Sequence, residues 1–147
     1  MARILFIDDN RDLGKFTKDR IEESGEHTVD WFGEDAWEIT AKRIEAFPDK
    51  SWDLLLLDIH YPTDEWGGLW LYNSLVRGGI GKSWEKRVIV YSQYFVENMD
   101  WSKVRDSQML ALRIFLDTAN IPYDCALPNQ DFDRATLLEK IEEVLKR

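Results

Sequence analysis

The sequence predicts an open, doubly wound α/β sandwich, in which helices cover both faces of a parallel β-sheet. Five short segments typical of strands alternate with five longer segments of helical periodicity along the 147 residues. Parallel strands need crossover connections, and these are right-handed, so strict alternation implies a parallel sheet. Nothing is left for a second domain after the last expected helix, so we expect one domain over 1–147 and no effector domain.

The strands are expected at five apolar segments. The strongest pattern is Leu54-Leu55-Leu56-Leu57, which needs apolar cover on both faces and therefore a central place in the sheet. Ile4 to Ile7 form a similar run, and Val88-Ile89-Val90 is β-branched as well as apolar. The expected strands cover 3–7, 27–32, 53–58, 87–92 and 123–127.

The helices are expected where apolar residues recur three and four positions apart. Leu13, Thr17 and Ile21 lie on one such stripe, and Gly25 is a plausible end of that helix. The expected helices cover about 12–24, 34–46, 68–76, 100–119 and 131–146. The longest of them has an inward stripe of Trp101, Val104, Gln108, Ala111, Phe115 and Thr118.

Composition limits the partners and the compartment. The chain has 28 acidic and 19 basic residues and a net charge of −9, which argues against a nucleic-acid partner because phosphate backbones are bound through clustered Lys and Arg. Its apolar runs, such as 54–57, are far short of the roughly 20 residues of a membrane-spanning helix. Cys125 is the single cysteine, so no intrachain disulfide can form. We therefore expect a cytoplasmic protein without membrane contact.

Carboxylates follow two of the expected strands. The ligand crevice of an open α/β sheet lies outside the carboxyl ends of its strands. Asp8 and Asp9 follow the first strand, and Asp58 ends the third. If these strands are neighbours, the three acids share one pocket, where their repulsion calls for a cation. A hard ion such as Mg²⁺, which takes oxygen ligands, is the natural counter-charge. The alternative for the pair is a helix cap, with Asp9 or Asp12 at the start of the first helix.

These residues resemble the receiver domain of two-component response regulators, the CheY-like family. The resemblance spans essentially the whole chain and implies a flavodoxin-like, three-layer sandwich with a five-stranded sheet of order 2-1-3-4-5. Its motifs are Ile4-Leu5-Phe6-Ile7-Asp8-Asp9-Asn10, Leu54 to Asp58 followed by Pro62, Gly67-Gly68-Leu69, and Val88-Ile89-Val90-Tyr91-Ser92.

The resemblance also implies a role for each site residue. Asp58 would be the phosphoacceptor for a sensor histidine kinase or a phosphotransfer protein. Asp8, Asp9, Asp58 and the backbone carbonyl of His60 would hold Mg²⁺. Ser92 would bind a phosphoryl oxygen and move toward it in the active state. A phosphoryl group on Asp58, which carries about two negative charges, would then shift the population of two conformations.

The pattern departs from the family at the fifth expected strand. Receivers carry a Lys before the proline that ends this strand, whereas this chain has Leu127 before Pro128. The strand's usual aromatic is displaced by one residue to Tyr123, which reverses its face unless a bulge intervenes. Ser92 and Pro128 are also further apart than is usual in receivers. These departures indicate an altered partner surface or signalling without phosphate.

Three functions follow from these observations. The first is phosphorelay signal transduction by a stand-alone, atypical receiver, a phosphoprotein that signals by protein contact through the face formed by 100–119, 123–127 and 131–146. The second is a pseudo-receiver, a protein-interaction module that works without phosphorylation and is favoured by Leu127. The third is a Mg²⁺-dependent phosphohydrolase, which is disfavoured because His60 replaces the second Asp that such enzymes need. We therefore expect no enzymatic activity.

The aromatic residues leave a further alternative open. Four of the seven tryptophans fall outside the expected strand core, and packing is the simpler explanation for most of them. Trp66, in a polar loop beside the expected site, and Trp101 could instead form a partner-binding patch.

Overall fold

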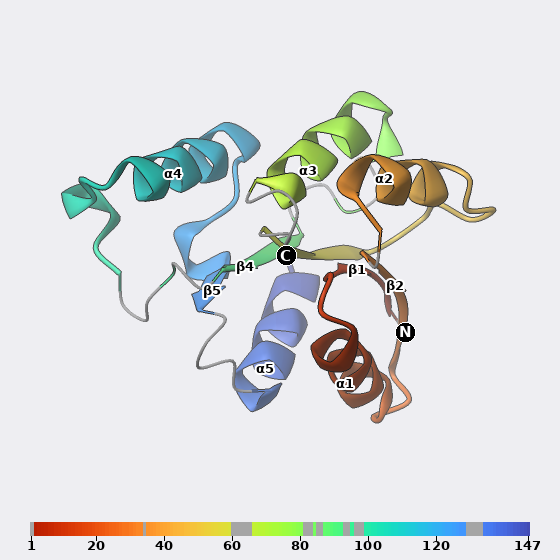
Figure 1. Cartoon of the computed structure of the whole chain (residues 1–147). Coiled ribbons are helices and arrows are strands. Elements are labelled where there is room, and N and C mark those ends of the chain that lie inside the picture. The colour runs from red at the N-terminus through yellow and green to blue at the C-terminus, as the bar shows by residue number, and fades with distance from the viewer. Residues whose placement is uncertain are drawn as a thin grey trace.

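Five parallel strands form one sheet in the order β2-β1-β3-β4-β5. The computed structural model describes residues 2–33, 35–59, 66–80, 84, 87–92, 95, 99–128 and 134–147, with only the backbone described at 92, 134 and 135. Helices α1 and α5 cover one face of the sheet, and α2, α3 and α4 cover the other (Figure 1). The predicted fold class and strand order are confirmed.

The strands occupy nearly the expected positions. Strand β3 is central and is buried along its whole length, as its leucine run predicts. It pairs with β1 on one side, where Ile7 is opposite Leu57, and with β4 on the other, where Asp58 is opposite Tyr91. The observed bounds are Ala2–Ile7 for β1, His27–Phe32 for β2, Leu54–Asp58 for β3, Val88–Ser92 for β4 and Ala126–Pro128 for β5.

The first helix begins at a side-chain cap and is followed by a glycine turn. The side chain of Asn10, rather than Asp9 or Asp12, caps the first helix by accepting the backbone N–H of Leu13. Gly25 follows this helix at a φ of 75°, a conformation that favours glycine. The bounds are Arg11–Glu22 for α1, Trp37–Glu45 for α2, Gly67–Arg77 for α3, Ser107–Ala119 for α4 and Arg134–Leu145 for α5.

The single helix expected over 100–119 is wrong. A short 3-10 helix, η2, covers Trp101–Lys103, and Val104 is extended. Asp106 then starts α4, because its side chain accepts the backbone N–H groups of Gln108 and Met109. The buried residues of α4 are Leu112, Phe115 and Leu116, so the inward stripe also differs from the predicted one.

The fifth strand is shorter than expected. Tyr123–Cys125 form a 3-10 helix, η3, after Pro122, whose carbonyl accepts the N–H of Cys125. Because Tyr123 does not lie in a strand, its one-residue offset does not decide which face of the sheet its side chain is on. Its ring stacks on Trp101 with the ring centroids 5.2 Å apart, and its hydroxyl donates to Asp117 at 2.5 Å.

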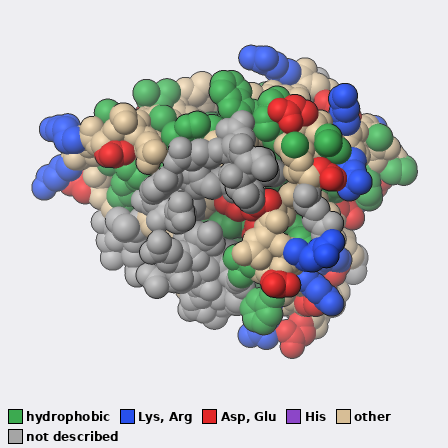
Figure 2. Space-filling view, in the orientation of Figure 1, with side chains coloured by type: hydrophobic (Ala, Val, Ile, Leu, Met, Phe, Trp, Pro, Cys, Tyr) green, Lys and Arg blue, Asp and Glu red, His purple; other side chains and the backbone are tan. Residues whose placement is uncertain are grey.

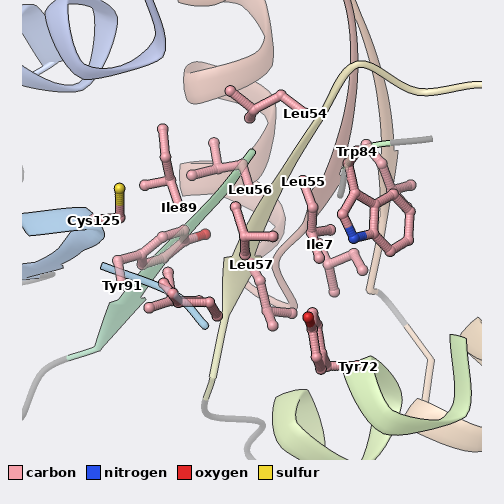
Figure 3. Close-up of a cluster of buried hydrophobic side chains, with 14 of the residues drawn as sticks. Ile7, Leu54, Leu55, Leu56, Leu57, Tyr72, Trp84, Ile89, Tyr91 and Cys125 are labelled. Atoms are coloured by element: carbon pink, nitrogen blue, oxygen red, sulfur yellow. The ribbon is translucent and has the colours of Figure 1, made fainter. Parts of the chain in front are cut away.

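The core lies on both faces of β3. Figure 3 shows the leucines of this strand between aromatic side chains, among them Tyr72, Trp84 and Tyr91. Trp84 and Trp101 are buried, so the patch considered around Trp66 and Trp101 is wrong for Trp101, which packs in the core. Among the described residues, no helix has the length and hydropathy to span a membrane.

Candidate functional site

The three expected carboxylates come together at one end of the sheet. Asp8 follows β1, Asp9 follows Asp8, and Asp58 ends β3, the neighbour of β1. Each offers a carboxylate oxygen, and these oxygens all lie within 4.8 Å of one another. Asp8 and Asp58 are buried, and Asp9 is half-buried. We call these three residues the acid pocket.

Charged side chains are distributed unevenly on the face seen in Figure 2. Acidic side chains appear in its middle and also toward its margins, where the Lys and Arg side chains in view lie.

Asp8 is fixed by hydrogen bonds from three directions. Its Oδ2 accepts the hydroxyl of Tyr91 at 2.5 Å, and its Oδ1 accepts the backbone N–H of Asn10 at 2.9 Å. The indole Nε1 of Trp31 donates to the backbone oxygen of Asp8 at 2.9 Å. Because buried polar groups need such partners, these contacts hold the carboxylate in one orientation.

The surroundings of Asp9 in the pocket disfavour its ionised form. Burial and the neighbouring charge of Asp8 raise the pKa of Asp9 from 3.8 to about 6, while a hydrogen bond with Asp58 lowers it in part. Desolvation and a like charge both disfavour an ionised carboxylate. A cation bound between the carboxylates would remove this cost, and carboxylate oxygens are ligands that Mg²⁺ accepts. The donor set therefore fits a hard divalent ion.

The glycine motif that opens α3 brings this helix against the pocket. A Cβ atom on Gly68 would lie 2.4 Å from the backbone oxygen of Asp58 and 2.6 Å from the Cα of Ile59. The N–H of Gly68 donates to the carbonyl of Ile59 at 2.9 Å. Only glycine permits so close an approach, so Gly68 helps to set the position of the Asp58 backbone.

Two expected site residues lie partly or wholly outside this description. His60, whose carbonyl was expected to bind Mg²⁺, is outside the described residues, as is Pro62. Ser92 ends β4 opposite Pro128, but only its backbone is described. Leu127 lies on β5 opposite Tyr91, so an apolar side chain occupies the position where receivers carry a Lys.

Tyr91 is the site residue that sequence reasoning missed. It is 1% exposed and lies in a strand that otherwise reads as core. The available signal was a phenol in an apolar strand directly before Ser92, because a buried tyrosine hydroxyl needs a hydrogen-bond partner.

A second group of possible ligands lies at the opposite ends of the strands. Glu26, His27 and Glu142 offer ligand atoms within 4.8 Å of one another. The Nδ1 atom of His27 accepts the backbone N–H of Ala2 at 3.3 Å, so the ring hydrogen is on Nε2, which lies 2.5 Å from Glu142. A metal on Nε2 would displace this hydrogen. The group is therefore best explained as a hydrogen bond between β2 and α5.

No protein-family model and no curated protein sequence matches this chain. Solved structures do match. A CheY-like response regulator receiver domain protein from Methanospirillum hungatei is 25% identical, with a TM-score of 0.62 over 99% of this chain and 94% of that one. This chain has the receiver-domain fold.

Other receiver structures extend the likeness at lower identity. The chemotaxis response regulator CheY4 of Vibrio cholerae is 14% identical, with a TM-score of 0.67 and 98% of each chain covered. A response regulator receiver protein from Pseudoalteromonas atlantica is 12% identical, with a TM-score of 0.64 over 98% of this chain and 97% of that one. The receiver fold therefore accounts for nearly the whole chain.

Proposed function

We propose that this protein is a response regulator receiver that accepts a phosphoryl group on Asp58 from a sensor histidine kinase or a phosphotransfer protein. The observation that carries this proposal is the acid pocket itself, three carboxylates with oxygens within 4.8 Å at the carboxyl end of a receiver-type sheet. Carboxylates gathered without an evident structural need indicate a functional site.

Asp8, Asp9 and Asp58 are the residues that would hold Mg²⁺, together with the backbone carbonyl expected from His60. When bound, the ion supplies positive charge to the oxygens of the transferring phosphoryl group. The half-buried Asp9, with its raised pKa, is the group that gains most from such a charge.

The nucleophile of the transfer is a carboxylate oxygen of Asp58. This oxygen forms the new P–O bond while the P–N bond of a phosphohistidine donor breaks, and the electron pair of that bond stays on the donor imidazole. Asp58 is only 6% exposed, so the surrounding residues limit the attack of water on the product. Ser92 is proposed to donate its hydroxyl to a phosphoryl oxygen.

Output is proposed to occur by protein contact through α4, β5 and α5. A phosphorylated Asp58 carries about two negative charges, about one more than the carboxylate that it replaces, beside β4. This added charge can favour another arrangement of this edge of the sheet. Leu127 cannot supply the cation that would bind the phosphoryl group here. We expect the response to be weaker than in a receiver with a Lys, and Leu127→Lys should prolong the life of the phosphorylated state.

The second candidate is a pseudo-receiver that binds its partner without phosphorylation. The apolar Leu127 opposite Tyr91 favours it, because this end of β5 contributes no charge to phosphoryl recognition. The two candidates differ in whether Asp58 is ever modified.

Intact-mass spectrometry tests the proposal directly. The protein is incubated with Mg²⁺ and acetyl phosphate, beside Asp58→Ala and the matched control Asp19→Asn, an exposed acid on α1. We expect one phosphoryl adduct on the wild type and on Asp19→Asn and none on Asp58→Ala. If no adduct forms with small donors or with any histidine kinase of the same cell, the pseudo-receiver is favoured.

A further inference from the structure

We propose that Tyr91 is a positioning residue of the acid pocket, whose phenol holds Asp8 in the orientation that binds a divalent cation. The inference rests on the proposed function, because it concerns the cation site of the same pocket. It assigns to β4 a part in cation binding that neither the acid motif nor the receiver fold supplies.

The reach of the side chain is the first argument. Strand β3 lies between β1 and β4, so the two residues are on strands about twice the 4.8 Å spacing apart. Tyr91 nevertheless places its hydroxyl 2.5 Å from Oδ2 of Asp8. The backbone of Tyr91 is opposite Asp58 in the sheet, so its side chain extends from beside one buried acid of the pocket to the other, Asp8. A shorter side chain on β4 could not make this contact.

Burial is the second argument. Tyr91 and Asp8 are each 1% exposed, so water does not compete freely for this hydrogen bond. The three residues before Tyr91 in β4 are Val88, Ile89 and Val90, and phenylalanine would fill the same apolar space. The hydroxyl is therefore used for Asp8 rather than for packing. A donor to an ionised carboxylate makes a hydrogen bond roughly twice as strong as a neutral pair.

The chemistry of the donor is the third argument. A neutral hydroxyl orients a carboxylate and leaves the negative charge of the pocket in place for a cation. Asp8 accepts from Tyr91 on Oδ2 and from the backbone of Asn10 on Oδ1, which fixes the plane of the carboxylate. A carboxylate has about four acceptor sites, so one carboxylate can accept hydrogen bonds and also contribute an oxygen to a metal site.

The test is a Mg²⁺ titration of the full chain, followed by intrinsic tryptophan fluorescence. Trp31 is a built-in reporter, because its indole donates to the backbone oxygen of Asp8. Tyr91→Phe removes only the hydroxyl and is compared with Tyr72→Phe, which removes the hydroxyl of another buried tyrosine whose ring packs on Phe115.

We expect Tyr91→Phe to weaken Mg²⁺ binding about tenfold and Tyr72→Phe to leave it unchanged. Thermal unfolding with and without Mg²⁺ separates positioning from a structural role. Loss of stability alone would lower both melting temperatures equally, whereas loss of positioning shrinks the stabilisation by Mg²⁺. Wild-type affinity in a folded Tyr91→Phe protein overturns the inference and leaves the proposed function standing. Absence of Mg²⁺ binding by the wild type overturns both.

A second measurement needs no variant at Tyr91. The five tyrosines are labelled with 3-fluorotyrosine, and Tyr91 is assigned by Tyr→Phe substitution at the other four positions. We expect the fluorine resonance of Tyr91 to shift on Mg²⁺ binding. A Tyr91 resonance that does not move while Mg²⁺ saturates the protein overturns the inference.

Discussion

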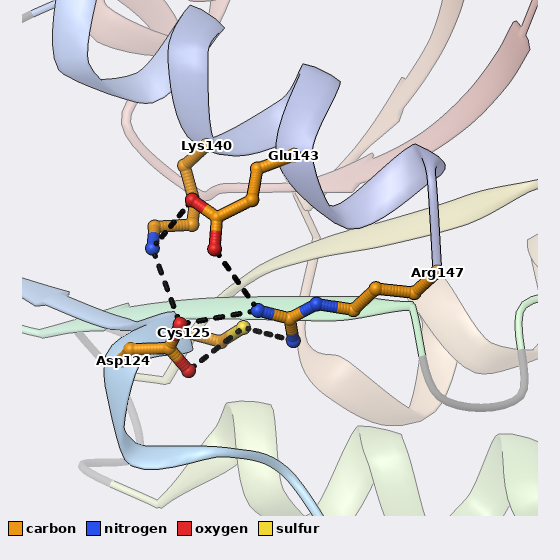
Figure 4. Close-up of polar contacts among 5 residues, drawn as sticks. All are labelled: Asp124, Cys125, Lys140, Glu143 and Arg147. Carbon is orange, nitrogen blue, oxygen red and sulfur yellow. Dashed lines mark hydrogen bonds and ion pairs between the residues drawn. The ribbon is translucent and has the colours of Figure 1, made fainter.

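Acidic side chains are balanced in opposite ways in two regions of the molecule. Near the C-terminus, Lys140 and Arg147 contact Asp124 at 3.4 and 3.1 Å (Figure 4). Burial works to raise the pKa of Asp124, but these two cations hold it below its ordinary value. In the acid pocket, burial and the charge of Asp8 raise the pKa of Asp9 to about 6.

The comparison indicates that the cluster near the C-terminus stabilises the fold, whereas the acid pocket serves function. The network at the C-terminal end of α5 joins this helix to η3 and is made of Asp124, Lys140, Glu143 and Arg147. It neutralises its own charge, and Arg147 also donates to the buried Cys125 at 3.3 Å. Around Asp9, burial and the charge of Asp8 disfavour the ionised carboxylate. An ionised Asp9 therefore costs stability unless a cation binds. This cost indicates that the pocket serves cation binding rather than folding.

The largest expected effect comes from the backbone support of the pocket. Gly68→Ala should lower the free energy of unfolding by about 3 kcal/mol, because its Cβ would overlap the backbone of Asp58 and Ile59. It should also abolish phosphorylation by displacing Asp58. Urea unfolding measures the first effect and mass spectrometry the second.

Gly78→Ala is the matched control for this substitution. Its Cβ would meet its nearest neighbours at 3.5 Å, an ordinary contact, and its φ is −74°. We expect it to change stability by less than about 1 kcal/mol. Equal effects of the two substitutions would show that close packing does not support the pocket.

The next effect concerns the ionisation of Asp9 in the pocket. The folded pKa of Asp9 is raised, so its ionisation costs stability, and this cost appears as the pH rises from 3.8 through about 6. Asp9→Asn should therefore match the wild type below this window and exceed it above, by about 1–2 kcal/mol after allowance for solvent screening. Urea unfolding between pH 3.5 and 7.5 without divalent cations measures it.

Addition of Mg²⁺ should distinguish the wild type from Asp9→Asn. At neutral pH it should raise the melting temperature of the wild type and have a smaller effect on Asp9→Asn, which lacks one ligand charge. Asp19→Asn is the control and should follow the wild type. A wild type that gains no stability over Asp9→Asn on addition of Mg²⁺ would remove the pocket from the list of cation sites.

The smallest effect is expected in the network at the C-terminal end of α5. Arg147→Ala should cost about 0.5–1 kcal/mol, because its ion pairs with Asp124 and Glu143 are largely exposed. The cost should fall with added salt, and Mg²⁺ binding should not change. Lys146→Ala, on the neighbouring exposed residue, should have no effect. Weakened Mg²⁺ binding in Arg147→Ala would mean that the two regions are coupled.

Much of this arrangement could be predicted because it depends on local pattern. The leucine run of β3 demands burial on both faces, and alternation with helices demands parallel pairing. Once β1 and β3 are neighbours, Asp8, Asp9 and Asp58 must meet at one end of the sheet. The break before α4 could not be predicted from periodicity, because the capping side chain of Asp106 competes with a continuous helix.

Hydrophobic period fixes the fold class, and the ends of the expected strands fix which three acids can meet, whereas the strand order rested on the resemblance to receiver domains. The tertiary structure alone decided that Tyr91 reaches Asp8 across β3, that Tyr123 stacks on Trp101 and that Arg147 neutralises Asp124. These contacts join residues far apart in the chain or on different elements. Their partners are chosen by packing and burial in three dimensions, which local sequence does not encode.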